Sequence, residues 1–426
     1  MNINKIESLF RTGFFHIFGS SVINKIIAFL SSIVLVRILT KSEYGVFTYS
    51  WNIYSILLLF NGLAMDSSAL QLSSEKSTDD KYRKKIFDYG TRGGLLFNLF
   101  LGIIILFIAL KAPLKINGAR EILMLLFLLP IIHFLFNMSS AFLRSKKMNK
   151  EFSTLNTLNT SLLFIFSLCF SFLFKEKGLV FGYYLSYGIS VIFGCLFFKI
   201  RLIDNKRQKD YQLSKDDKKG LMSISLVSTC NNGLSQLLYL LDVFILGIVL
   251  PNEMILASYK VATTIPTALT FIPSCLVIYI YPYFAERKDN GKWCLRRYKQ
   301  ILLGLGAFNF LLSFILFLFA PFIVNTFFGT QYSDSVIIFR ILMINYFISG
   351  TFRVLSGNLL VTQRKLKFNL FVAIFSGIVN IIGDYFFIQW WGSVGAALAT
   401  LLVVIVSSIL STSYLIYTFK QRIENE

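Results

Sequence analysis

Eight ionisable side chains lie inside long apolar stretches of the sequence, where a charge is costly to bury. They are five cations and three anions: Lys25, Arg92, Lys260, Arg340 and Arg353, and Asp66, Asp242 and Asp384. An Arg, Lys or Asp at the centre of a membrane helix costs about 2.5–3.5 kcal/mol, so such residues usually face a cavity or a partner. The excess of two positive charges favours an anionic ligand, because Coulomb attraction is strong in a low-dielectric setting. Since Arg offers a fork to phosphate oxygens and Lys a point charge, the pattern predicts binding of a phosphate-bearing group.

The cations differ in their predicted depth. Lys25 lies near the middle of its apolar stretch, and Arg353 lies about eleven residues before the next basic loop. Both are too deep to reach the membrane surface easily, so each lines a cavity or pairs with an acid. Arg92 and Arg340 lie about six residues inside opposite faces, from where a long side chain can also extend to the interface. We take Lys25, Arg92, Lys260 and Arg353 as the candidate substrate-binding residues.

The three acids are candidates for ion coupling or for ion pairing. Asp242 lies at about the same depth as Lys260 on the neighbouring apolar stretch, so the two either neutralise each other or act separately. Asp66 lies near a helix end, where a structural role is the simpler explanation. Asp384 is either part of an ion-coupling site or a lone buried carboxyl group that Asn380 or a water molecule satisfies.

The composition shows what kind of chain must position these residues. Of 426 residues, 55% are hydrophobic and 15% are charged, whereas soluble proteins carry roughly 25% charged residues. This excludes a disordered chain, a disulfide-framed secreted domain and an ordinary cytosolic enzyme, and it predicts an integral membrane protein. The five cysteines show no CxxC spacing and the two histidines share no motif, so neither a metal site nor a cofactor is predicted.

Apolar windows long enough to span a bilayer of about 30 Å recur along the whole chain. They fall at 12–39, 44–72, 87–110, 119–143, 152–174, 178–198, 221–249, 254–284, 295–320, 334–361, 368–391 and 393–418. The first window is longer than the apolar core of a signal peptide, so it is expected to stay as a membrane helix. We therefore predict an all-α protein of twelve transmembrane helices, with a six-helix lobe at 1–200, a basic cytoplasmic linker at 201–220 and a second six-helix lobe at 221–426.

The net charge of +20 follows from this topology. Thirty of the 42 Lys and Arg residues fall in loops on the side of the two termini, and seven fall in loops on the other side. Because cytoplasmic loops carry the excess of Lys and Arg, both termini are predicted to be cytoplasmic. The same asymmetry accounts for the charge without a nucleic-acid partner.

A weak internal repeat supports the division into halves. Glu-Tyr-Gly-Val-Phe-Thr-Tyr at 43–49 and Glu-Met-Ile-Leu-Ala-Ser-Tyr at 253–259 each open the second helix of a half. Repeats of this kind are typical of transporters, with the substrate site between the halves. In the eighth window, Pro266, Pro273 and Pro282 remove backbone hydrogen bonds, which suits either a bendable helix or a static kink.

Several segments resemble the polysaccharide-exporter branch of the superfamily that unites multidrug, oligosaccharidyl-lipid and polysaccharide transporters. The segments are Val-Arg-Ile-Leu at 36–39, Glu-Tyr-Gly-Val-Phe at 43–47, Asn-Gly-Leu at 61–63, Asp-Val-Phe-Ile-Leu-Gly at 242–247, Ser-Tyr-Lys at 258–260, Tyr-Pro at 281–282, Asn-Ile-Ile at 380–382 and Gly-Ser-Val-Gly-Ala-Ala-Leu-Ala-Thr at 392–400. Each is weak alone, but their order covers nearly the whole chain.

The resemblance implies a flippase with a MATE-like fold, in which a cavity between two lobes opens alternately to each side. Such proteins move an undecaprenyl-pyrophosphate-linked oligosaccharide, as in O-antigen, lipopolysaccharide or capsule assembly, across the bacterial cytoplasmic membrane. The expected partners are the lipid bilayer and the lipid-linked oligosaccharide, with a glycan polymerase as a candidate partner. The sequence leaves open whether transport is coupled to protons, to sodium or to neither.

Two other functions compete with this one. A cation-coupled multidrug antiporter of the same fold would use Asp66, Asp242 or Asp384, but the excess of intramembrane positive charge argues against a carrier of organic cations. A membrane enzyme would need an acid/base pair or a His-Asp motif near a membrane face. The sequence contains neither motif, so no enzymatic activity is predicted.

Overall fold

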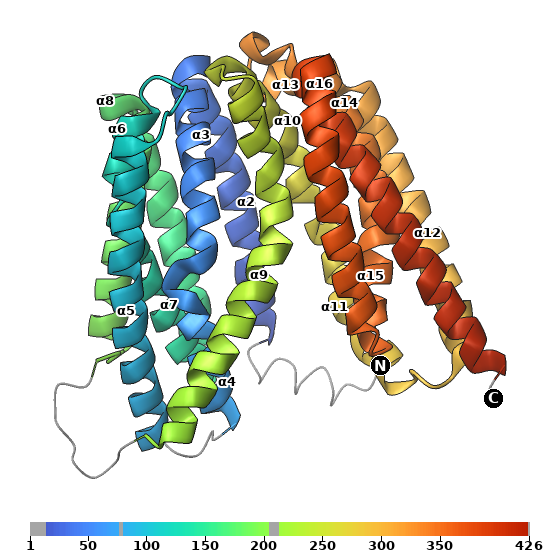
Figure 1. The fold of residues 1–426 in the computed structure, drawn as a ribbon, viewed down its shortest axis with the longest axis horizontal. Coiled ribbons are helices and arrows are strands. Elements are labelled where there is room, and N and C mark those ends of the chain that lie inside the picture. Colours follow the sequence, from blue (N-terminus) through green and yellow to red (C-terminus); the bar gives the residue numbers. More distant parts are fainter. Residues whose placement is uncertain (1–13, 76–79, 204–212, 425–426) are drawn as a thin grey trace. The chain divides into compact units, whose positions relative to one another are not determined.

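A computed structural model describes residues 14–75, 80–203 and 213–424 (Figure 1). Within these ranges the chain is helical and contains no strand. Eight described helices are long and apolar enough to cross a membrane, and α6 with α7 forms a ninth if that bent pair is one span. The predicted integral membrane protein of all-α class is confirmed, whereas the count of twelve spans stays a prediction.

The chain divides into two compact units, Met1–Leu237 and Leu238–Glu426. The helices of unit 1 are α2 (Phe14–Ile38), α3 (Lys41–Leu57), η1 (Leu58–Ala64), α4 (Met65–Glu75), α5 (Asp80–Lys111), α6 (Ala119–Leu126), α7 (Leu129–Ser145) and α8 (Asn149–Phe197). The boundary between the units falls inside α9 (Lys215–Val249). Nine of the twenty residues of the predicted linker, 204–212, lie outside the described residues.

Unit 2 continues from α9 through a second set of helices. They are α10 (Glu253–Leu269), α11 (Phe271–Glu286), α12 (Gly291–Leu318), α13 (Ala320–Phe327), η2 (Thr330–Tyr332), α14 (Ser335–Ile348), η3 (Ser349–Arg353), α15 (Val354–Thr362) and α16 (Leu366–Glu424). Pro266 lies inside α10 and Pro282 inside α11, and the two helices meet at Thr270. The proline-rich window is therefore interrupted rather than one regular helix.

The starts of α3 and α10 explain the internal repeat. Thr40 caps α3, and its hydroxyl accepts the Glu43 N–H while the Glu43 carboxylate accepts the Thr40 N–H. Asn252 caps α10 by accepting the Met254 N–H at 2.9 Å. Glu43 and Glu253 both lie in a first turn, where a negative charge stabilises the helix. The repeated Glu thus marks a helix start in each half.

The helix that follows this start in unit 1 is broken at η1, and Asn98 of α5 holds the break. The Asn98 carboxamide oxygen accepts the Gly62 N–H at 2.8 Å, and its nitrogen donates to Asn61 at 2.8 Å and to the Pro130 carbonyl at 3.1 Å. Gly62 has φ +53°, and a Cβ there would lie 2.3 Å from ring carbons of Phe134. Only glycine fits this turn, because it accepts both the left-handed backbone and the close ring.

Two long helices are sharply bent at positions that correspond in the two units. α8 is non-helical at Lys175 and α16 at Gly392, each with φ near +55° (+53° and +59°). Three residues after each bend a glycine approaches the preceding arm: a Cβ on Gly178 would lie 2.1 Å from the Phe170 carbonyl oxygen, and one on Gly395 1.9 Å from that of Phe387. Each long helix is therefore a hairpin of two tightly packed arms.

The bend of α8 lies at a charged surface of unit 1. Lys175 forms an ion pair with Glu43 at 2.8 Å, and Lys177 forms one with Glu121 at 2.5 Å. These pairs join the bend to the starts of α3 and α6. They place the bend where the sequence predicts a loop between two membrane spans.

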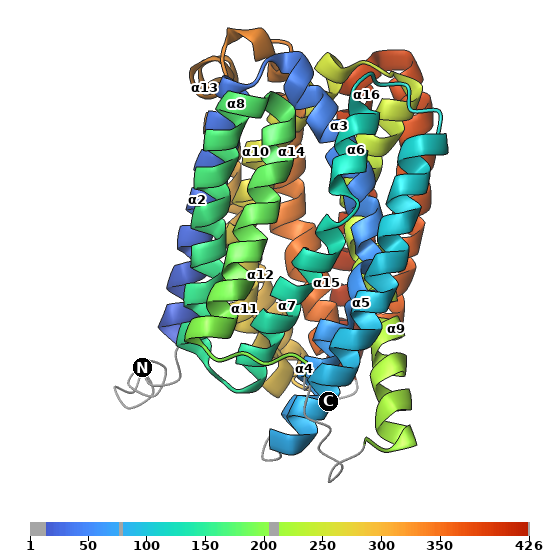
Figure 2. The same cartoon turned by 90° about the vertical axis from the view of Figure 1, so that its left-hand side faces the viewer.

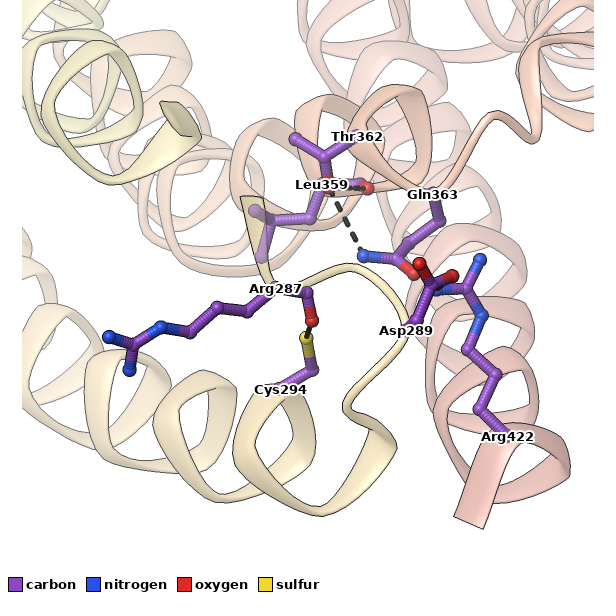
Figure 3. A network of polar contacts seen from close by, with 7 residues as sticks. All are labelled: Arg287, Asp289, Cys294, Leu359, Thr362, Gln363 and Arg422. Atoms are coloured by element: carbon purple, nitrogen blue, oxygen red, sulfur yellow. Dashed lines mark hydrogen bonds and ion pairs between the residues drawn. The ribbon is translucent and has the colours of Figure 1, made fainter. Parts of the chain in front are cut away.

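The turn between α11 and α12 is tied to the ends of neighbouring helices in unit 2 (Figure 3). The Cys294 thiol donates to the Arg287 carbonyl at 3.3 Å, which closes the turn on itself. Asp289 pairs with Arg422 near the end of α16 at 3.5 Å. Cys294 is fully buried here, as expected for a small apolar side chain rather than a metal ligand.

The break at η1 yields a stability prediction. We expect Asn98→Leu to lower the free energy of unfolding by about 2–3 kcal/mol, because the buried Gly62 N–H loses its acceptor. Thermal unfolding of the purified full chain in detergent measures this. Asn358→Leu is the matched control, since exposed Asn358 bonds only the Val354 carbonyl of its own helix. Equal melting temperatures for the two variants would contradict the role given to Asn98.

Candidate functional site

A buried polar cluster lies in unit 2 among three helices. Asp242 comes from the end of α9, Tyr259 from α10, Asn380 and Asp384 from the first arm of α16, and Thr400 from its second arm. Asp384 is 0% exposed, Tyr259 1%, Asn380 3% and Asp242 8%. Hydrocarbon-facing helices seldom bury so many polar groups together without a function.

Asp242 is the hydrogen-bond acceptor at the centre of this cluster. Its Oδ2 accepts the Tyr259 hydroxyl at 2.8 Å and the Thr400 hydroxyl at 2.6 Å. Its Oδ1 accepts the Asn380 carboxamide N–H at 3.1 Å. Three donors aimed at one carboxyl group stabilise its ionised form.

Asp384 lies beside Asp242 but receives none of these donors. Neither of its carboxyl oxygens has a hydrogen-bond partner, and the Asn380 carboxamide oxygen also lacks one. The two carboxyl groups are near enough for their charges to interact, although no hydrogen bond joins these two described residues. Two adjacent carboxylates in a buried site cannot both keep their charge, because their repulsion adds to the cost of desolvation.

The hairpin of α16 is what brings the acids and their partners together. Gly392 takes the left-handed turn, and Gly395 lets the second arm approach the first. Gly383 then packs against Ala399, where a Cβ on the glycine would lie 3.4 Å from the alanine Cβ. Their chain neighbours, Asp384 and Thr400, consequently lie at the same level of the hairpin.

This arrangement suits a proton or a small monovalent cation. Unpaired oxygens of Asp384 and Asn380 point to a cation that takes oxygen ligands, and a single positive charge would balance the second carboxylate. In the described part of the chain, no group of three or more His, Cys, Asp or Glu side chains could hold a metal ion. The cluster therefore differs from a multi-carboxylate site for a divalent ion.

The predicted cations are separate from this cluster. Lys25 of α2 and Lys260 of α10 are exposed on their units, and Arg353 is half-buried at the end of η3. Within the described ranges none of the three side chains has a hydrogen-bond or ion-pair partner. The ion pair between Lys260 and Asp242, left open by the sequence, is not formed between these two described residues.

The other predicted intramembrane charges lie outside the buried polar cluster, and two of them have partners close by. Arg92 is 54% exposed and pairs with Asp88, one turn earlier on α5, at 2.9 Å. Arg340 donates to the Phe317 carbonyl at 3.2 Å and lies over that ring at 5.3 Å. Asp66 lies in the first turn of α4 in unit 1, so it belongs to a different unit from Asp242 and Asp384.

The sequence identified part of the cluster and missed the rest. It placed Asn380 beside Asp384, but Asn380 donates to Asp242 instead. Tyr259 and Thr400 appear in the quoted motifs without a role. The spacing of residues was the available sequence signal for the cluster. Asn380 and Asp384 are four residues apart and so lie on one face of a helix, and Thr400 lies two helical turns after the Gly392 bend.

Residues 34–337 match the family model described as polysaccharide biosynthesis protein. This covers more than two thirds of the chain, and it confirms the resemblance to polysaccharide exporters. A search of curated protein sequences found no match.

Two solved structures of similar fold are those of transporters. One is entitled "Lipid II flippase MurJ, inward closed conformation", with TM-score 0.72, 14% identity, and 96% of this chain and 90% of that chain covered. Another is an inward-facing multidrug resistance MATE family transporter of the MOP superfamily, with TM-score 0.71, 16% identity, and 94% and 96% covered. At these identities the likeness shows the fold alone.

The cluster yields a second prediction. We expect the melting temperature of the wild-type chain to rise with sodium at neutral pH, or with acid in choline buffer, because either cation neutralises the carboxyl pair. A stabilisation of about 1–3 kcal/mol is expected for a cation well above its dissociation constant. We expect Asp384→Asn to be more stable than wild type in choline and to gain little from sodium or acid.

The matched control is Asp289→Asn, which removes a carboxylate from a solvent-exposed pair and should keep the wild-type response. A wild-type melting temperature that is insensitive to both cations would refute the site.

Proposed function

The chain belongs to the family of polysaccharide biosynthesis proteins, and we propose that it is a flippase for a lipid-linked oligosaccharide. Its substrate is an undecaprenyl-pyrophosphate-linked repeat unit, as in O-antigen or capsule assembly. It moves this lipid across the bacterial cytoplasmic membrane by alternating access between two lobes of six helices. The family and the fold shared with a lipid II flippase support a transporter of this class.

One observation carries the substrate assignment: Lys25, Lys260 and Arg353 lie in apolar helices and have no side-chain partner among the described residues. An unpaired cation at membrane depth is costly, so it calls for a counter-charge. A pyrophosphate headgroup provides that charge and several acceptor oxygens. Arg353 can engage two of these oxygens, whereas the lysines act as point charges. Arg92 has a weaker claim, because Asp88 already neutralises it.

The topology completes the proposal. The bends at Lys175 and Gly392 each divide a long helix into two arms of membrane-spanning length. We propose that each arm crosses the membrane once and that α9 crosses it as well, which would give twelve spans with both termini on one side. The basic loops favour the cytoplasm for that side. A flippase with this topology would deliver its glycan to a polymerase on the outer face.

We assign the coupling role to the Asp242–Asp384 pair. A buried site that requires one cation to balance its second carboxylate can link the binding of sodium or a proton to the conformation of its lobe. Tyr259 of α10 contacts Asp242 and precedes Lys260 in the chain, so a shift of α10 would move both. This gives a short route from the cation site to the proposed headgroup site.

A multidrug antiporter is the second candidate, because the MATE transporters share the fold and a buried acidic pair would also serve cation exchange. The unpaired cations argue against it, since organic cations would be repelled by Lys25, Lys260 and Arg353.

The third prediction tests the headgroup residues in cells that lack the native gene. We expect Lys260→Ala and Arg353→Ala to reduce surface glycan at least tenfold, with lipid-linked intermediates accumulating and normal levels of protein in the membrane. Lys260→Arg should restore much of the export, because it keeps the charge. Lys367→Ala, at an exposed position in the first turn of α16, is the control and should export normally.

Normal export by both alanine variants would remove the site assignment. Drug resistance on overexpression, with unchanged glycans on deletion, would favour the antiporter instead.

A further inference from the structure

A small polar pocket lies in unit 1. It contains no residue of the buried polar cluster in unit 2, and Lys25, Lys260 and Arg353 do not line it. It has a volume of about 180 Å³ and lies among α4, α7 and α8, which pack against one another through α7 (Figure 2). The polar side chains that line it include Asp66, Asn137, Ser140, Arg144 and Asn156, and Phe152 contributes an aromatic ring.

Several of these groups have unused hydrogen-bonding capacity. Ser140 is 8% exposed, and its hydroxyl oxygen is buried without any partner. Asn137 has no side-chain hydrogen bond to any described residue. Asn156 spends its amide N–H on the Phe152 carbonyl at 2.8 Å, which leaves its carboxamide oxygen as an acceptor. A buried unpaired hydroxyl costs free energy, so it indicates a ligand that bonds there.

The two charges of the pocket oppose each other without bonding. Asp66 and Arg144 both line the pocket, and no ion pair joins these two described residues. The charges of Asp66 and Arg144 sum to zero. The pocket therefore lacks the excess of positive charge that would favour a pyrophosphate group. It offers instead a carboxylate to accept hydroxyl protons, a guanidinium to donate to hydroxyl oxygens, and carboxamides that do both.

The size of the pocket restricts what can enter it. Pockets for drug-sized ligands are larger, at about 300–1,000 Å³. One ring with several hydroxyl groups fits this volume. The Arg144 guanidinium lies over the Phe152 ring, 5.6 Å from its centroid, so that ring holds the guanidinium at the pocket.

From this geometry we infer that the pocket binds one sugar ring of the transported glycan. The inference rests on the proposed function and adds a specificity site for the glycan, separate from the headgroup site. Arg144 lies in the last turn of α7, close to the basic residues Lys146 and Lys147. Because basic loops are predicted to be cytoplasmic, we place the pocket at the cytoplasmic face, where the glycan would enter.

The test uses the purified full chain and free glucose, galactose, mannose and N-acetylglucosamine as probes at millimolar concentration. Saturation-transfer NMR measures binding of each sugar. We expect at least one sugar to bind the wild type, and we expect Asn137→Leu and Asn156→Leu each to weaken that binding roughly five- to tenfold, the loss typical of one or more hydrogen bonds.

Two further variants make the result specific. Asn156→Ser can keep a bond to the helix backbone while withdrawing the carboxamide, so it should bind weakly even if Asn156→Leu folds poorly. Thr154→Val is the control on the same helix; Thr154 is exposed, bonds only the Lys150 carbonyl and does not line the pocket. It should bind sugar as the wild type does.

The inference is overturned if no sugar binds the wild type, or if a folded Asn137→Leu/Asn156→Leu double variant binds as well as wild type. Binding of phosphoethanolamine in place of any sugar also overturns it, and would indicate a lipid headgroup. Transport in liposomes separates the two proposals. Sugar binding without movement of lipid-linked glycan would contradict the proposed function and leave only a sugar site that is unconnected with transport. Movement of glycan without sugar binding would contradict the assignment of the pocket and keep the proposed function.

Discussion

The structure of unit 2 depends on the neutrality of two buried carboxyl groups. Asp242 collects three donors, from Tyr259, Asn380 and Thr400, while Asp384 beside it receives none. In water this difference in the number of hydrogen-bond donors would matter little, because solvent would satisfy both carboxyl groups. Inside an apolar bundle, an uncompensated carboxylate is among the costliest groups to bury, and for this reason we propose that a proton or a metal cation accompanies the pair. The rest of the site follows from that requirement.

The two hairpins share one geometry but carry different residues at the level of the acidic pair. The same number of residues separates the bend at Lys175 from the bend at Gly392, Phe170 from Phe387, and Gly178 from Gly395. The helices α8 and α16 are therefore equivalent hairpins. Eight residues before the bend, α16 carries Asp384 and α8 carries Ser167. A common scaffold thus holds an acid in one unit and a small neutral residue in the other, which is consistent with cation coupling confined to unit 2.

Much of the fold was predictable from the sequence, because a membrane requires long apolar helices and the capped starts at Glu43 and Glu253 mark a repeat. The site was less predictable. Asp242 and Asp384 were identified because an acidic residue is costly to bury in an apolar stretch. Which of the two receives hydrogen-bond donors depends on contacts between segments that are distant in the sequence. The pocket of unit 1 gave no sequence signal beyond Asp66, since its other polar groups are ordinary Asn, Ser and Arg residues until α4, α7 and α8 pack.

We propose that cation binding at the Asp242–Asp384 pair couples a cation gradient to transport. This is tested most directly by movement of a lipid-linked oligosaccharide in liposomes that contain only this protein, with a sodium gradient or a proton gradient as the sole energy source. We expect one of the two gradients to accelerate wild-type movement, and we expect Asp384→Asn to show no acceleration by either. Wild-type movement that is indifferent to both gradients, or acceleration that survives in Asp384→Asn, would contradict it.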